Sequence, residues 1–144
     1  MSLSVVNPVE SAHAQRQAAD PKASVWVAAS AGSGKTKVLV DRVLNLLLEG
    51  VCPEQILCLT FTRAAAAEMA NRINHRLLLW ATLPGAALAE DLFRLHRAPA
   101  DAATQARARR LFASVLDVGL QIETLHAFCQ MILKRFPLEA GVAP

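Results

Sequence analysis

Eight consecutive residues have the types and the spacing of a loop that binds phosphate. A small residue is followed by four residues of any type and then by Gly, Lys and Thr: Ala29, Ser30, Ala31, Gly32, Ser33, Gly34, Lys35 and Thr36. Small residues let the backbone curl so that several N–H groups converge on phosphate oxygens, in front of the positive end of a helix. Lys35 is placed to reach the β- and γ-phosphates, and the Thr36 hydroxyl is placed to ligate Mg²⁺. The pattern therefore predicts a site for a nucleoside triphosphate, with Lys35 and Thr36 as its catalytic groups.

Regular elements are predicted on both sides of this loop. Residues 24–28 form an apolar run that predicts a short buried strand, and residues 36–49 have the apolar spacing of a helix. This helix is expected to stop at Gly50, with Pro53 beyond it. Two further strand–helix units follow, at 56–61 with 63–80 and at 120–123 with 125–136. Strands that alternate with helices of this length predict an α/β fold with a parallel sheet and flanking helices.

Three more helices are predicted outside these units. Residues 83–117 are expected to form two of them as a helical insertion, with a break at Pro99 and an N-cap at Asp101. The third lies ahead of the loop at 11–19 and carries Gln15. A chain of 144 residues is long enough for one domain with a core and too short for two domains of ordinary size.

Basic side chains gather in one part of the chain. The net charge of +3 permits an anionic partner without requiring one. Between residues 94 and 110 a single acid, Asp101, stands among five arginines: Arg94, Arg97, Arg107, Arg109 and Arg110. Such a cluster is typical of a solvated helix face or of a nucleic-acid contact, and the sequence leaves both interpretations open.

The cysteines and the amino terminus indicate where the protein works. Cys52, Cys58 and Cys129 are odd in number and form no C-x-x-C pair. This spacing favours reduced thiols over a disulfide framework or a zinc site. Residues 1–9 lack the basic start and the apolar run of a signal peptide, and the apolar stretch at 44–48 is too short to cross a membrane. We therefore expect a cytoplasmic protein that makes no membrane contact.

Four stretches of the sequence together resemble a known family. In chain order they are Gln15-Arg16-x-Ala18, Ala31-Gly32-Ser33-Gly34-Lys35-Thr36, Leu59-Thr60-Phe61-Thr62-Arg63-Ala64-Ala65-Ala66-Ala67-Glu68-Met69 and Thr124-Leu125-His126-Ala127-Phe128-Cys129. Their order and spacing resemble the UvrD/Rep-like superfamily 1 DNA helicases, in which these stretches are the Q motif and motifs I, Ia and Ib. The stretches at 80, 108–113, 119–129 and 135–142 are also similar to the AddA-type subunit of the bacterial helicase–nuclease that resects double-strand breaks.

The resemblance implies what individual residues bind. Gln15 would hydrogen-bond the adenine edge of ATP, because an amide offers both a donor and an acceptor. The loop at 29–36 would hold the phosphates of ATP, with Mg²⁺ on Thr36. Hydroxyl groups would meet the phosphates of single-stranded DNA, and an aromatic ring would stack on a base. These DNA contacts would be Thr60, Phe61, Thr62, Arg63, Thr124 and His126.

Two of these residues have ordinary structural interpretations as well. Without the motif, Phe61 would be taken as a core residue that ends a buried strand. A histidine at a helix start, such as His126, is often a structural or capping group. The sequence alone does not decide between these roles and DNA contact.

No carboxylate for hydrolysis is evident in the sequence. ATP hydrolysis needs an acid that orders Mg²⁺ and its water, usually an Asp-Glu pair that ends an apolar strand. The only adjacent acids, Glu90 and Asp91, lie in a helical stretch. The resemblance therefore implies a partial motor domain 1A of the RecA-like phosphate-loop NTPases, spanning 1–144 and cut before motif II. Without the central strands of that domain, the three predicted strands are expected to pair anew or to self-associate.

The resemblance implies the N-terminal, ATP-binding part of an ATP-dependent DNA helicase. This part alone is expected to bind ATP without hydrolysing it. The full-length protein would move 3′ to 5′ on single strands, act on double-stranded DNA ends with a partner nuclease–helicase subunit, and serve double-strand break repair. A small phosphate-loop kinase and a non-catalytic nucleotide-binding module are the alternatives. The run at 60–63 argues against a kinase, which has no need of it.

Overall fold

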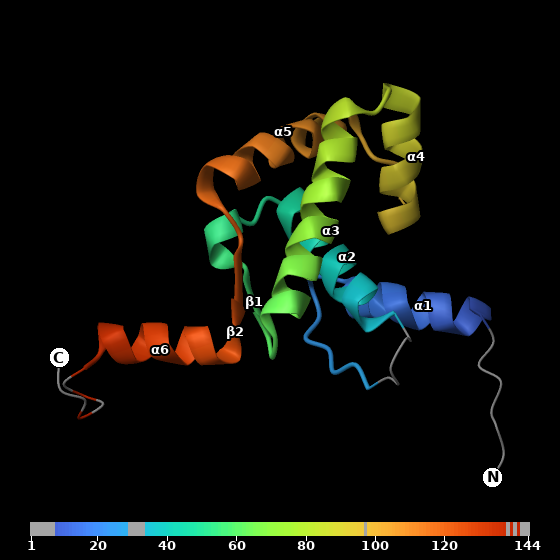
Figure 1. Cartoon of the computed structure of the whole chain (residues 1–144). Helices are drawn as coiled ribbons and strands as arrows, with labels where there is room; N and C mark the ends of the chain where they lie inside the picture. Colours follow the sequence, from blue (N-terminus) through green and yellow to red (C-terminus); the bar gives the residue numbers. More distant parts are fainter. Residues whose placement is uncertain (1–7, 29–33, 97, 138, 140, 142–144) are drawn as a thin grey trace, which may run out of the picture.

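Helices make up most of the protein and accompany one small sheet (Figure 1). The computed structural model describes residues 8–28, 34–96, 98–137, 139 and 141. Within these ranges the sheet has two parallel strands, β1 (Leu57–Thr60) and β2 (Gln121–Thr124). A long helix, α3 (Arg63–Thr82), packs against both strands. Two of the three predicted strands thus form the expected parallel pair, in a structure that is mostly helical.

The segment at 24–28 corrects the prediction of a buried first strand. It forms no regular structure, and Trp26 is 94% exposed, with Val25 and Val27 at 44% and 40%. An apolar run is stable as a strand only when a neighbouring strand takes up its backbone N–H and C=O groups. β1 and β2 pair with each other, and among the described residues no strand lies beside 24–28. The apolar pattern was therefore correct in composition and wrong in structure.

Helix α2 (Lys35–Leu48) begins directly after the phosphate-loop residues. It ends as the sequence predicts, with Gly50 at a φ of +94°, a conformation that favours glycine. The apolar side chains of α2 repeat at helical spacing and are buried: Val40, Val43, Leu44, Leu47 and Leu48. Helix α1 (Pro8–Ala19) packs on α2 and buries Ala18 and Ala19.

The segment at 83–117 contains the two expected helices, α4 (Gly85–His96) and α5 (Ala102–Val118). Asp101 is the N-cap of α5, and its Oδ1 accepts a hydrogen bond of 2.7 Å from the Thr104 backbone N–H. These hydrogen bonds to Thr104 lower the pKa of the Asp101 carboxyl, because they favour its ionised form. Both helices contribute to the core that α2 and α3 build, so 83–117 packs as part of the same body. Whether this segment is an insertion remains a prediction.

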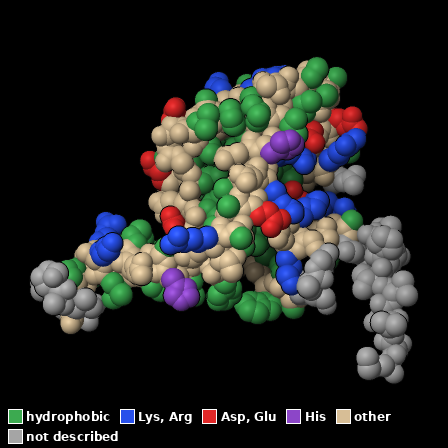
Figure 2. Space-filling view, viewed as in Figure 1, with side chains coloured by type: hydrophobic (Ala, Val, Ile, Leu, Met, Phe, Trp, Pro, Cys, Tyr) green, Lys and Arg blue, Asp and Glu red, His purple; other side chains and the backbone are tan. Residues whose placement is uncertain are grey.

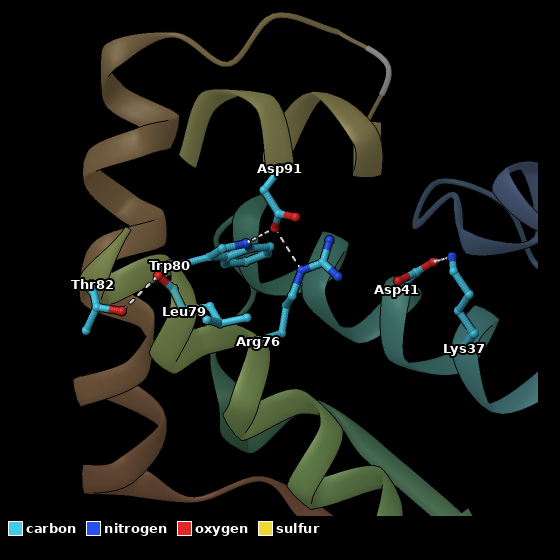
Figure 3. Close-up of polar contacts among 7 residues, drawn as sticks. All are labelled: Lys37, Asp41, Arg76, Leu79, Trp80, Thr82 and Asp91. Atoms are coloured by element: carbon cyan, nitrogen blue, oxygen red, sulfur yellow. Dashed lines mark hydrogen bonds and ion pairs between the residues drawn. The ribbon is translucent and has the colours of Figure 1, made fainter. Parts of the chain in front are cut away.

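The centre of the core lies among α2, α3 and α4. Trp80 near the end of α3 is fully buried, and its indole needs a polar partner there. Asp91 of α4 supplies it, since its Oδ2 accepts from Trp80 Nε1 at 2.6 Å and from Arg76 Nε at 2.8 Å (Figure 3). One carboxylate oxygen therefore ties two side chains of α3 to α4. The other fully buried large side chains are Leu44, Leu47, Ile73, Leu77, Leu88 and Leu92.

The remaining elements are short. The 3₁₀ turn η1 (Pro53–Gln55) leads into β1, and helix α6 (Leu125–Arg135) follows β2 directly. Among the described residues of α6 no side chain is buried. Burial raises the pKa of the Cys58 thiol on the covered face of β1, so that this thiol stays protonated. The three cysteines form no disulfide among the described residues, as the sequence predicts.

The arginine cluster has a use that neither sequence interpretation anticipated. Arg107 on α5 donates to the Leu48 carbonyl at 2.7 Å, and Arg109 donates to the Leu83 carbonyl at 2.9 Å. These carbonyls lie at the C-terminal ends of α2 and α3, where backbone acceptors lack partners in the helix and positive charge is favourable. Arg94 pairs with Glu90 within α4, and Arg97 lies outside the described residues. Figure 2 shows basic and acidic side chains interspersed on this face of the molecule.

Candidate nucleotide and DNA site

The first turn of α2 has the features of an anion site. Its N-cap is Gly34, with a φ of +85°, and no side chain caps the turn. The turn carries no acidic residue, so the positive end of the helix is not neutralised there. Lys35 is exposed at this end and Thr36 is half-buried. These features fit a triphosphate with its Mg²⁺, which is the group that the loop sequence implies.

A cavity lies beside this turn, between α2 and the segment that precedes the loop. Its volume is about 470 Å³. Its wall combines the Lys35 ammonium with apolar side chains, as small-molecule sites usually do. The lining residues are Ala18, Ser24, Val25, Val27, Lys35, Val38, Leu39 and Arg42. The exposed segment 24–28 therefore forms one wall of the space next to the predicted phosphate site.

The structure brings Gln15 to the end of the loop. A Cβ placed on Gly34 would come within 3.2 Å of the Gln15 Nε2 atom. The Gln15 amide thus touches the backbone where α2 begins, as expected for a side chain that contacts a nucleotide held there. The other predicted phosphate contacts, Ala29, Ser30, Ala31, Gly32 and Ser33, lie outside the described residues.

The predicted DNA contacts converge at the carboxyl ends of the two strands. Thr60 of β1 is directly opposite Thr124 of β2 in the parallel register. Each strand is followed by a helix, so the first turns of α3 and α6 lie at this same edge, low in the view of Figure 1. Neither first turn contains an acidic residue. Two helix N-termini at one edge favour phosphate groups there.

The hydrogen bonds of the threonines divide them into two kinds. Thr62 and Thr124 are N-caps whose hydroxyl oxygens accept from the backbone N–H of Ala65 and Ala127. Because a hydroxyl also has a proton to donate, both remain able to bond a phosphate oxygen. Thr60 instead donates its hydroxyl proton to the Thr62 carbonyl at 3.0 Å. Thr62 and Thr124 are therefore better placed than Thr60 to donate to a phosphate.

The structural interpretations of Phe61 and His126 are both wrong. Phe61 is 83% exposed, so it is not a core residue. His126 is exposed, and the N-cap of its helix is Thr124. Arg63 is exposed at the first position of α3. These three side chains reach solvent at the edge where Thr60 and Thr124 lie.

We expect Phe61→Ala to weaken binding of single-stranded DNA about 5- to 100-fold, because base–aromatic stacking contributes about 1–3 kcal/mol per base. The slope of affinity against salt should not change, since that slope reports phosphate contacts. Fluorescence anisotropy with a labelled oligothymidine at several salt concentrations measures both quantities. Leu116→Ala is the matched control, because Leu116 is a 64% exposed apolar residue on α5. Equal affinity of wild type and Phe61→Ala would remove Phe61 from the DNA site.

The structure adds two residues that the sequence reasoning missed. Arg42 and Asn45 of α2 hydrogen-bond the carboxyl end of α1 and the turn after it. The sequence contained a signal for them, since they follow Lys35 by seven and ten residues. In an α-helix such spacing places side chains on one face.

The loop at the start of α2, the amide against it and the paired strand ends define a phosphate-loop nucleotide-binding domain of the helicase type. The chain belongs to the UvrD/REP helicase family, whose N-terminal domain profile, described as "UvrD/REP helicase N-terminal domain", matches residues 11–143. This assignment agrees with the resemblance that the four motifs indicate.

Curated relatives extend the assignment, and those described here are all AddA proteins, the first-named component of an ATP-dependent helicase/nuclease. The chain is 40% identical over 122 residues to AddA of Ligilactobacillus salivarius, covering 85% of the chain and 8% of that protein. It is 39% identical over 127 residues to AddA of Desulfitobacterium hafniense, covering 85% and 8%. For Lactobacillus acidophilus the identity is 34% over 131 residues, covering 90% and 9%. The chain thus spans less than a tenth of the length of these relatives.

Two negative findings accompany these matches. No solved structure matches the chain significantly. In the part of the chain that the structure describes, no helix has the length and apolar character needed to cross a membrane.

Proposed function

We propose that the chain forms the ATP-binding part of motor domain 1A in an ATP-dependent DNA helicase, and that it also carries one part of the single-stranded DNA path. The observation that carries the proposal is the register of β1 and β2. It places Thr60 opposite Thr124 and so joins the residues of motifs Ia and Ib at one edge. The amide of Gln15 against Gly34 supports the nucleotide half of the proposal.

The whole protein is proposed to be one component of a helicase–nuclease complex. The relatives are named as one subunit of an ATP-dependent helicase/nuclease, which indicates a protein that works with another subunit. The proposed activity is 3′-to-5′ movement on single strands at DNA ends, driven by ATP and Mg²⁺ in the cytoplasm, during repair of double-strand breaks. The partner would be the second nuclease–helicase subunit of the complex.

Within this protein each group has a proposed task. Lys35 and the N–H groups at the start of α2 would hold the triphosphate, which is the anion that this helix end favours. Thr36 would ligate the Mg²⁺ that offsets phosphate charge. Gln15 would select the base, and Thr62 and Thr124 would donate to DNA phosphates while Phe61 stacks on a base.

We expect the 144-residue chain to bind ATP·Mg and to show no steady-state hydrolysis. Glu90 and Asp91, its only adjacent acids, lie within α4, and Asp91 is engaged by Trp80 and Arg76. They are therefore not the acidic pair at a strand end that would order the attacking water. Arginines that reach the γ-phosphate contribute about 10³–10⁵ in rate where families supply them. A coupled phosphate-release assay measures this, and turnover near one per second, a rate of about the order of ordinary kinases, would contradict the expectation.

Titration with single-stranded DNA separates this proposal from the alternatives. A helicase domain should bind an oligothymidine at low salt, and the affinity should fall steeply as salt rises. A small phosphate-loop kinase should instead transfer phosphate to a nucleotide or metabolite and should not bind DNA. Phosphotransfer without DNA binding would replace the helicase proposal with the kinase.

A further inference from the structure

One face of α2 carries both the phosphate-site lysine and a set of side chains directed at α1. Lys35, Val38, Arg42 and Asn45 are spaced by three, four and three residues, which places them in one row along the helix. Lys35, Val38 and Arg42 all line the cavity of about 470 Å³. The row therefore leads from the predicted phosphates, past the cavity, to the contact between α1 and α2.

Arg42 and Asn45 bind the end of α1 through four hydrogen bonds. The Arg42 guanidinium donates to the carbonyls of Asp20 at 2.6 Å, Ala23 at 2.7 Å and Ala18 at 3.3 Å. Asn45 Nδ2 donates to the Ala19 carbonyl at 3.0 Å. The last carbonyls of a helix lack partners within it, and a cation beside them is favourable. The two side chains thus hold the last turn of α1 and the turn that follows it.

Asn45 holds this contact at a cost. It is only 5% exposed, and its Oδ1 has no hydrogen-bond partner among the described residues. A buried polar atom without a partner is unfavourable, and a leucine of similar volume would avoid the penalty. Nδ2 compensates only through its bond to α1, so this bond is what an asparagine offers at a position that otherwise suits an apolar residue.

This attachment determines where Gln15 lies. Ala18 and Ala19 follow Gln15 by three and four residues, so the clamped carbonyls and the Gln15 side chain belong to the same stretch of helix. Apart from these two alanines, none of the side chains described at 12–19 is buried. α1 therefore has a small apolar contact with α2, and its position depends on the polar one.

We propose that Arg42 and Asn45 are positioning residues for base recognition: they hold α1 on α2 so that the Gln15 amide meets the base of a nucleotide whose phosphates lie at the start of α2. This proposal rests on the proposed function, because it takes ATP as the ligand. It assigns to α2 two tasks, phosphate binding at its first turn and placement of the base-reading helix two turns later. Arg42 and Asn45 need not touch the nucleotide to set its selectivity.

The test is a set of dissociation constants for the full chain, measured by calorimetry with ATP·Mg, GTP·Mg and inorganic tripolyphosphate·Mg. Tripolyphosphate has no base, so it reports the phosphate site alone. The variants are Gln15→Ala, Arg42→Ala, Arg42→Lys and Arg107→Ala. Arg107→Ala is the matched control, since Arg107 binds the Leu48 carbonyl at the other end of α2 in the same manner. Circular dichroism establishes that each variant is folded.

We expect Gln15→Ala and Arg42→Ala to lower the preference for ATP over GTP about five- to tenfold, the equivalent of one hydrogen bond, with tripolyphosphate binding unchanged. Arg107→Ala should leave the preference as in wild type. In the Gln15→Ala background, Arg42→Ala should cause no further loss, because its effect passes through Gln15. If Arg42→Ala does not fold, Arg42→Lys keeps the charge but cannot bridge three carbonyls, and it should show the same loss.

Two results would overturn the proposal while the proposed function stands. One is an unchanged ATP preference in a folded Arg42 variant, and the other is an equal loss in Arg107→Ala. A wild-type chain that binds neither ATP nor tripolyphosphate would contradict the proposed function itself, and the positioning role with it. The tripolyphosphate measurement therefore separates failure of the phosphate site from failure of base positioning.

Discussion

Replacement of Lys35 by alanine is expected to weaken ATP·Mg binding about 10- to 100-fold, because a hydrogen bond between charged groups contributes about 1.5–3 kcal/mol. Lys35 is exposed at the first turn of α2 and lines the cavity there. Its ammonium is the only full positive charge that the loop pattern itself supplies to the triphosphate. Titration calorimetry with ATP·Mg measures the change in affinity.

Lys22→Ala is the control for this loss. Lys22 is an exposed lysine whose Nζ lies 4.0 Å from the Glu49 carboxylate, at the other end of α2. Its removal changes the net charge by the same amount without touching the phosphate site, so ATP binding should stay within about twofold of wild type. Equal binding by Lys35→Ala and wild type would mean that the nucleotide lies elsewhere.

Replacement of Asp91 by alanine should lower the free energy of unfolding by about 2–3 kcal/mol and the melting temperature by about 6–10 °C. One oxygen of Asp91 accepts from both Trp80 Nε1 and Arg76 Nε (Figure 3). Trp80 has no exposed surface, so its N–H would lose its partner with no water to replace it. Arg76 would keep its charge in a half-buried site without the carboxylate. Thermal and urea denaturation followed by circular dichroism measure both changes.

The neighbouring acid gives a matched comparison. Glu90 is exposed and pairs only with Arg94 on the same helix, an arrangement that contributes about 0.3–0.5 kcal/mol at most. Glu90→Ala should therefore melt within about 2 °C of wild type. If Asp91→Ala melts like Glu90→Ala, the shared carboxylate does not stabilise the contact between α3 and α4.

Local signals in the sequence were sufficient to predict the helices. The end of α2 follows from Gly50, and the start of α5 follows from Asp101, because each signal acts through the residue's own backbone or side chain. The apolar run at 24–28 has no such local determinant. A strand depends on a neighbour, and the sequence does not state which neighbour is present. For the same reason the pairing of β1 with β2 could be expected as parallel, but its register could not.

Long-range polar contacts were beyond the sequence as well. Arg107 lies 59 residues from the Leu48 carbonyl that it binds, and Arg42 lies 22 from the Asp20 carbonyl. Such distances leave no pattern in the chain, so these arginines were interpreted by their charge alone. The candidate site was more accessible, since motif spacing identified Gln15, Thr60 and Thr124 before their positions were known. The exposure of Phe61 needed the structure.

The central claim is that the chain has two separate sites, one for ATP at the start of α2 and one for single-stranded DNA at the ends of β1 and β2. Backbone amide chemical shifts of ¹⁵N-labelled protein test it most directly, in one titration with ATP·Mg followed by an oligothymidine. ATP·Mg should shift the amides of 34–38 and the side-chain amide of Gln15. The oligothymidine should then shift those of 61–65 and 124–127. Shifts from both ligands confined to one set of residues, or oligothymidine shifts that leave 61–65 and 124–127 unmoved, would contradict the account.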